Sequence, residues 1–200
     1  MASSLNPAGV SRNLPVDWFE VELGSADPTA WLDSLGLEFT DRADPTAMSR
    51  ALASIRETFV EDSVDWAALY LPQPNGGIIA AAMIVDVFAL DVDDSPESYL
   101  EFVESHRDLR TPQLDISAFS TWRSAHPSGE LIGYSHLALV TPEPDSESSL
   151  EERAVFAVFP PGAAQMIRIT FRTARLGAFV DMTTETSAIV NAMTFDLATA

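Results

Sequence analysis

The fold of this chain is decided by the stretch RAVFAVFPPGAAQMIRITFRT, residues 153–173. Residues 153–159 form an apolar run of strand length. Pro160, Pro161 and Gly162 indicate a turn, because proline fixes φ near the value a turn needs and glycine can take a positive φ. Residues 165–173 alternate apolar and polar side chains, which is the period of a strand. The stretch therefore predicts a β-hairpin.

The chain after this hairpin predicts a helix over residues 177–192 and a short strand over 193–197. One stripe of the helix carries Phe179, Met182, Thr186 and Ile189 at helical spacing. Two more hairpins are predicted before residue 141. The first joins runs at 66–71 and 77–90 through an Asn-Gly turn, and the second joins 113–123 and 130–140 through His126 to Gly129. Residues 142–149 read as an acidic loop.

The remaining elements are helices and one strand. Residues 18–23 alternate like a strand, and residues 27–33 suggest one helical turn. Asp44 is expected to cap a helix that has Pro45 in its first position and the apolar residues Met48, Leu52, Ile55 and Phe59 on one face. Ser95 is expected to cap the next helix, whose inner side should carry Tyr99, Phe102, Val103 and His106.

This order of elements, β–α–ββ–α–ββ–ββ–α–β, predicts an α+β fold with a mostly antiparallel sheet, because hairpins join antiparallel strands. The run at 77–90 is almost continuously apolar, which is typical of a strand covered on both faces. The sequence therefore predicts a single-domain α/β/α sandwich. We expect one domain over residues 14–197, preceded by a flexible arm over residues 1–13.

Composition restricts the function. The chain has 200 residues, no cysteine and a net charge of −19, and its 11 basic residues are all arginine. The absence of cysteine excludes disulfides and thiol chemistry. The acidic charge argues against nucleic-acid binding. Neither a signal peptide nor an apolar run long enough to span a membrane is visible, so we expect a cytoplasmic protein without membrane insertion.

A family resemblance rests on three features. They are Leu14-Pro15-Val16-Asp17-Trp18, the hairpin around Pro160-Pro161-Gly162, and the closing helix before Met193-Thr-Phe195. In these features the chain resembles the PsbP-like superfamily, which includes LpqN-type actinobacterial proteins and DcrB-related secretion chaperones. The resemblance implies a PsbP-like fold and a protein that binds or scaffolds rather than catalyses. It carries no functional residue to this chain.

No catalytic or metal-binding motif emerges from the residues themselves. The three histidines, His106, His126 and His136, are scattered and lack zinc-ligand spacing. The nucleophile elbow Gly-x-Ser-x-Gly and a complete phosphate-binding loop are absent. Asp91, Asp93 and Asp94 resemble the start of a calcium loop, but a capped connection into the helix after Ser95 explains them better. We therefore predict no catalytic, cofactor-binding or metal-binding residue, and no cofactor.

Arg168 and Arg172 are the candidate partner-binding residues, because they project from one face of the predicted strand 165–173. Two planar guanidinium groups in this arrangement can grip a carboxylate or an acidic segment. Pairing with neighbouring strands or helices is the alternative. The sequence thus favours a non-enzymatic binding, adaptor or chaperone protein with an unidentified protein partner, linked to secretion or a multiprotein assembly. Self-association is left open. The alternative is a small-molecule-binding protein or enzyme with a pocket inside the sandwich, using His136, Tyr134 and arginines.

Overall fold

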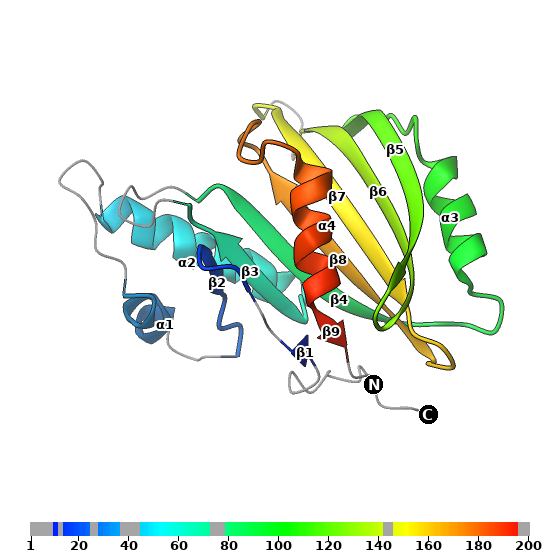
Figure 1. The fold of residues 1–200 in the computed structure, drawn as a ribbon. Helices are drawn as coiled ribbons and strands as arrows, with labels where there is room; N and C mark the ends of the chain where they lie inside the picture. Colours follow the sequence, from blue (N-terminus) through cyan, green and yellow to red (C-terminus); the bar gives the residue numbers. More distant parts are fainter. Residues whose placement is uncertain are drawn as a thin grey trace.

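The computed structural model describes residues 10–11, 14–24, 28–36, 45–72, 79–141 and 146–195 (Figure 1). Seven strands form one sheet in the order β2-β3-β4-β8-β7-β6-β5. Every neighbouring pair in that sheet is antiparallel. In this order, the strands are β2 (Trp18–Glu20), β3 (Trp66–Tyr70), β4 (Ala81–Ala89), β8 (Gln165–Thr173), β7 (Ser149–Phe159), β6 (Gly129–Val140) and β5 (Leu114–His126).

The three predicted hairpins are confirmed. They are β3–β4, β5–β6 and β7–β8, and all three lie in the same sheet. Gly162 takes a φ of +71° in the turn between β7 and β8, which is the conformation that favours glycine. A separate two-stranded pair joins the ends of the described chain, with β1 (Val10–Ser11) antiparallel to β9 (Thr194–Phe195). The rest of the predicted arm, residues 1–9 and 12–13, lies outside the described residues.

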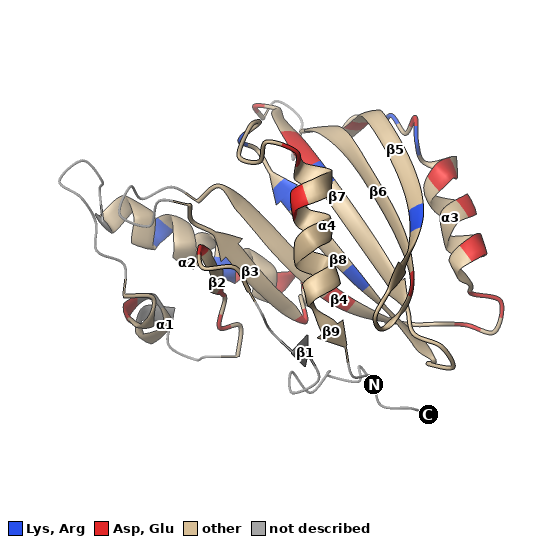
Figure 2. Cartoon of the chain, in the orientation of Figure 1, with Lys and Arg blue, Asp and Glu red and all other residues tan. Residues whose placement is uncertain are grey.

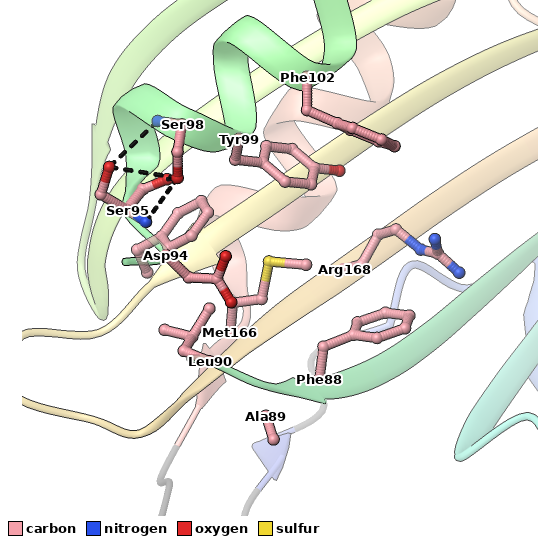
Figure 3. A pocket seen from close by; sticks show the side chains of 11 residues that line it. Phe88, Ala89, Leu90, Asp94, Ser95, Ser98, Tyr99, Phe102, Met166 and Arg168 are labelled. Atoms are coloured by element: carbon pink, nitrogen blue, oxygen red, sulfur yellow. Dashed lines mark hydrogen bonds between the residues drawn. The ribbon is translucent and has the colours of Figure 1, made fainter. Parts of the chain in front are cut away.

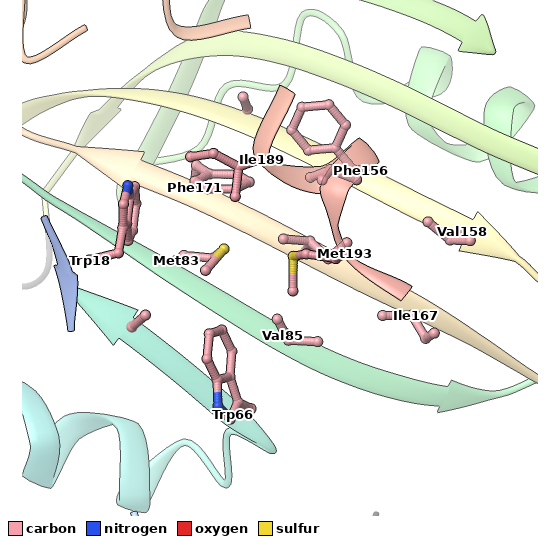
Figure 4. Close-up of a cluster of buried hydrophobic side chains, with 14 of the residues drawn as sticks. Trp18, Trp66, Met83, Val85, Phe156, Val158, Ile167, Phe171, Ile189 and Met193 are labelled. Carbon is pink, nitrogen blue, oxygen red and sulfur yellow. The ribbon is translucent and has the colours of Figure 1, made fainter. Parts of the chain in front are cut away.

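Helices cover both faces of the sheet, so the predicted α+β sandwich is confirmed. Helix α4 (Met182–Ala192) packs on one face through Met182, Ile189 and Val190. Figure 4 shows Ile189 among the side chains of this cluster. The cluster beneath it includes Trp18, Met83, Val85, Phe156, Ile167, Ile169 and Phe171. The opposite face carries α1 (Pro28–Ser34), α2 (Pro45–Glu61) and α3 (Pro96–Ser105). Helices α1 and α2 cover the β2–β3–β4 end of that face, and α3 packs over β6 and β7.

Several predicted boundaries are wrong. The last helix begins at Met182 and not at residue 177, because Asp181 accepts a hydrogen bond from the Thr184 amide and acts as its N-cap. Strand β7 begins at Ser149, inside the predicted acidic loop, because residues 149–152 pair with β6. The first predicted strand stops at Glu20, and β5 continues to His126. The Asp44 cap and the Asn75-Gly76 turn lie outside the described residues.

Helix α3 confirms one prediction and corrects another. Ser95 is its N-cap, and its hydroxyl accepts a hydrogen bond from the Ser98 amide at 3.1 Å. Phe102, which we expected on the inner side of the helix, is 61% exposed. Tyr99 and Leu100 pack against the sheet, and Val103 is the buried residue of the helix. Among the described helices, none combines the length and apolar character needed to cross a membrane.

Candidate functional site

A pocket of about 370 Å³ lies between α3 and the sheet (Figure 3). Most of its wall is apolar and comes from the end of β4, the start of β8, the end of β7 and the inner side of α3. The apolar lining consists of Phe88, Ala89, Leu90, Tyr99, Phe102, Phe159 and Met166. The polar lining consists of Asp94, Ser95, Ser98 and Arg168.

Three of the four polar lining residues stabilise the N-terminal end of α3. Ser95 and Ser98 form a reciprocal capping box, with the Ser98 hydroxyl accepting from the Ser95 amide at 2.8 Å. The Asp94 carboxylate accepts from the Asp91 amide at 2.7 Å. These contacts confirm the predicted connection into the helix for the aspartates at 91 and 94. The polar groups of these residues are thus already occupied by local structure.

Arg168 is the lining residue with unused hydrogen-bonding capacity. Its Nη2 donates to an Asp86 carboxylate oxygen at 2.9 Å, and the two residues are direct partners across β8 and β4. Its guanidinium also lies 4.5 Å from the ring centroid of Phe88. The Arg168 Nε–H is enclosed and has no hydrogen-bond partner in the described part of the chain. Buried donors are normally paired, so this N–H is available to donate a hydrogen bond to a ligand atom.

Two tyrosines lie beside Arg168. Tyr99 of α3 and Tyr134 of β6 lie close enough for each side chain to influence the pKa of the other. Burial raises the pKa of both phenols, and the positive charge of Arg168 opposes part of that rise. Both phenols are therefore neutral at physiological pH. They can orient a polar ligand group, but they do not act as bases.

His126 has a structural role. Its Nε2 donates to the Val190 carbonyl oxygen at 3.0 Å, and its Nδ1 accepts from the Ser128 amide at 3.0 Å. This neutral form fastens the end of α4 to the β5–β6 turn. Burial lowers the pKa of His126, and the carbonyls of Val190 and Met193 oppose that shift.

His136 lies on the face of the sheet that carries α2 and α3, and it is 7% exposed. Its ring stacks on Tyr134 with centroids 5.8 Å apart and on Phe119 at 6.2 Å. Phe119 reaches this position because β5 has an irregular register between Ser117 and Ser120, where Ala118 takes a φ of +50°. The predicted neighbourhood of His136 and Tyr134 is thus confirmed. Burial, followed by the charge of Arg153, lowers the pKa of His136 to about 4.

The two predicted partner-binding arginines occupy different surroundings. Figure 2 shows arginines on β8 and acidic residues along α3. Arg168 has the cross-strand pair with Asp86 described above. The Arg172 guanidinium lies 5.6 Å from the ring centroid of Phe59 on α2. Within the chain, Arg168 thus contacts a neighbouring strand and Arg172 contacts a neighbouring helix, as the alternative interpretation expected. The role of the two arginines toward a partner stays a prediction.

His106, the third histidine, is the C-cap of α3, with Nδ1 2.7 Å from the Phe102 carbonyl oxygen.

A second pocket, of about 400 Å³, lies on the other face beside α4. Trp18, Tyr70 and Phe179 stack along it, with centroids 5.2 Å and 5.4 Å apart. Burial, Asp17 and Glu185 together raise the pKa of Tyr70. The Glu185 carboxylate is engaged by the Val180 and Asp181 amides at 2.7 and 3.1 Å.

Sequence reasoning missed Phe88, Met166 and Arg153 as site residues. Phe88 and Met166 looked like ordinary core positions, and they are direct partners across β4 and β8. Arg153 was treated as the start of an apolar strand. Its side chain lies on the same face as Arg168 and Arg172, as the register of β7 and β8 shows. The alternation along residues 165–173 shows which side chains of that strand share a face. Which residues of other strands lie beside them can be known only from the order of the strands in the sheet.

Comparisons with known proteins show a similarity of fold and no match to a family. No protein-family model and no curated protein matches this chain. Among solved structures, the chain is similar to the solution structure of cyanobacterial PsbP (CyanoP) from Synechocystis sp. PCC 6803, with 10% identity and a TM-score of 0.48. The similarity covers 98% of this chain and 98% of that chain. It concerns the fold alone. Assignment to the LpqN-type or DcrB-related branches stays a prediction.

Proposed function

We propose that this protein is a non-catalytic binding protein for a small apolar molecule that carries a hydrogen-bond-accepting or anionic group. The ligand would occupy the pocket between α3 and the sheet. The observation that supports this proposal is the pairing of an apolar wall with one incompletely used guanidinium, that of Arg168. We keep the cytoplasmic location expected from the sequence as part of the proposal.

The size and lining of the pocket support a small ligand. Pockets for small molecules usually measure about 300–1,000 Å³ and combine apolar walls with a few polar groups. This pocket measures about 370 Å³ and has Phe88, Met166 and Phe159 in its wall. Burial of an apolar ligand body against these side chains would supply affinity. Arg168 would supply orientation, because its guanidinium is a planar, permanently charged donor.

The absence of catalysis is proposed from the state of the titratable groups near the pocket. The phenols of Tyr99 and Tyr134 are neutral, because burial raises the pKa of both. The Asp94 carboxylate is engaged by the Asp91 amide. These groups are arranged to hold the wall of the pocket rather than to move a proton.

The proposal is tested with anilinonaphthalene sulfonate, a fluorescent probe with an apolar body and one anionic group. We expect saturable binding to the wild type. Met166→Trp should abolish it, because the Met166 side chain points into the pocket and a larger indole there would fill it. Arg168→Gln should weaken binding about tenfold, which corresponds to the loss of one charge-assisted hydrogen bond.

Ala188→Trp is the matched control, because exposed Ala188 lines the second pocket beside α4. It should bind the probe like the wild type. Equal binding by Met166→Trp and wild type, or equal loss in both tryptophan variants, would contradict the proposed site. Thermal unfolding of each variant checks that it is folded.

The adaptor or chaperone role is the second proposal, and exposed Phe102 favours it. Phe102 is 61% exposed at the rim of the pocket, so an apolar segment of a partner protein could cover it and enter beside it. Affinity purification from the native organism with wild-type and Phe102→Ser baits tests this role, with Leu176→Ser as the control because Leu176 is 55% exposed elsewhere. Arg168→Ala with Arg172→Ala should also reduce capture of a specific partner. Equal capture by all baits would argue against it.

A further inference from the structure

Three groups that can carry positive charge stand side by side across the centre of the sheet. Arg172 on β8 is the direct partner of Arg153 on β7, and Arg153 is the direct partner of His136 on β6. Directly opposed residues of antiparallel strands have Cα atoms about 4.5–5.5 Å apart, and their side chains point to the same face. The two guanidinium groups therefore arise from neighbouring positions on one face.

Like charges directly opposite each other destabilise a sheet. One of the two arginines has a compensating carboxylate. Arg153 donates through Nε and Nη2 to one oxygen of Glu151, at 2.9 and 2.6 Å. Its Nη1 hydrogens are not part of that contact. The two side chains are 25% and 19% exposed, so the pair is reachable from solvent.

Arg172 has no such compensation. Its guanidinium lies 5.6 Å from the ring centroid of Phe59, and in the described part of the chain no carboxylate is within ion-pair distance of it. Asp86, the acidic residue on the same face of β4, is engaged by Arg168. Among the described residues, Glu151 thus supplies the one carboxylate within ion-pair distance of these two guanidinium groups, in a protein whose net charge is −19.

His136 adds an independent observation. It is 7% exposed, and its Nδ1 has no hydrogen-bond partner among the described residues. Burial lowers the pKa of the ring most, the charge of Arg153 lowers it further, and the charge of Glu151 opposes that shift. The ring also carries no charge of its own at neutral pH, so it adds no repulsion between itself and Arg153.

We propose that Arg153 and Arg172 form an oxyanion-binding site on the sheet, with His136 beside it. A carboxylate or phosphate group placed between the two guanidinium groups would accept hydrogen bonds from both, an arrangement that suits planar donors. It would also remove the repulsion between the two opposed charges. This site is separate from the α3 pocket, because neither arginine lines that pocket. The proposal therefore does not depend on the small-molecule function proposed above.

The test uses inorganic phosphate and acetate as probes, each titrated at constant ionic strength against chloride. The readouts are the NMR signals of the arginine Nε–H groups and of the His136 ring. We expect one or both probes to shift the Arg153 and Arg172 signals saturably at millimolar concentration. A bound anion should also raise the pH midpoint of the His136 ring, because it offsets the charge of Arg153. A response to phosphate alone assigns the site to phosphoryl groups, and a response to acetate alone assigns it to carboxylates.

Arg172→Gln should abolish the His136 response, and Arg175→Gln is its matched control. Arg175 is exposed and lies just beyond the end of β8, so its loss removes the same charge without touching the site. The wild-type spectra and Arg172→Gln decide the question without a variant of Arg153. No shift with either probe, or an equal loss of response in Arg172→Gln and Arg175→Gln, would overturn the proposal.

Discussion

Replacement of His136 by phenylalanine should make the protein less sensitive to acid. The ring contacts with Tyr134 and Phe119 can be kept by a phenyl group of similar size. The change removes no hydrogen bond from Nδ1, because that atom has no partner among the described residues. What it removes is the titration of a buried imidazole. The effect is therefore expected in the pH dependence of stability.

The direction follows from the lowered pKa. An unfolded histidine titrates near its ordinary pKa of 6.5, whereas in the folded protein the pKa of His136 is lowered to about 4. Above pH 6.5 the imidazole is neutral in both states, and its contribution to stability is fully present. As the pH falls below 6.5, only the unfolded chain takes up the proton, and stability is lost until the folded pKa is reached. At about pH 5 the loss should be about 2 kcal/mol.

The assay is urea unfolding of wild type and His136→Phe at about pH 7.5 and about pH 5, where the linkage difference is large. The two proteins share their other titrating groups, including His126, so the difference between them isolates His136. We expect the free energy of unfolding of the variant to rise relative to that of the wild type by about 2 kcal/mol when the pH is lowered from the higher to the lower value. A constant difference would refute the reasoning. An NMR titration of the His136 ring checks the midpoint directly.

Three further predictions concern stability, each measured by urea unfolding at neutral pH. Gly133→Ala should destabilise the protein by about 1–3 kcal/mol, because a methyl group would overlap the Trp122 ring on β5, and smaller damage would mean that the ring moves aside easily. Ser95→Ala should cost about 1 kcal/mol through the lost N-cap of α3, whereas an unchanged midpoint would show that the cap is dispensable. His126→Ala should cost about 1–3 kcal/mol, because the Val190 carbonyl keeps only the Met193 amide as a donor and the link between α4 and the β5–β6 turn is lost, and faster amide exchange in α4 is the signature that distinguishes this cause.

The strand pairs were predictable because their turns are local. Residues 160–162 and 126–129 carry their own turn chemistry, and the strands on either side have clear periodicity. The order of those pairs in the sheet was not predictable. Strands β4 and β8 are paired although Asp86 and Arg168 lie 82 residues apart, and no local signal specifies that contact. Helix boundaries failed where a cap competed with periodicity, as at Asp181.

The candidate site was less visible than the fold for the same reason. Arg168 and Arg172 could be selected because they share one face of one strand. The importance of Arg153 depends on its register with Arg172, which only the strand order supplies. The α3 pocket joins Phe88, Tyr99 and Met166 from three separate segments. Each of these residues looks like an ordinary core residue when only its own segment is considered.

The place of β8 in the sheet has a consequence for how the protein is made. β8 lies between β4 and β7, so it is the strand that joins β2-β3-β4 to β7-β6-β5. Its residues, 165–173, leave the ribosome after those of both halves. Until then the nascent chain holds two half-sheets, and the hydrogen-bonding edges of β4 and β7 have no partner. Open apolar edges of this kind favour aggregation. We therefore expect the emergence of residues 165–173 from the ribosome to be the step that protects the chain from aggregation.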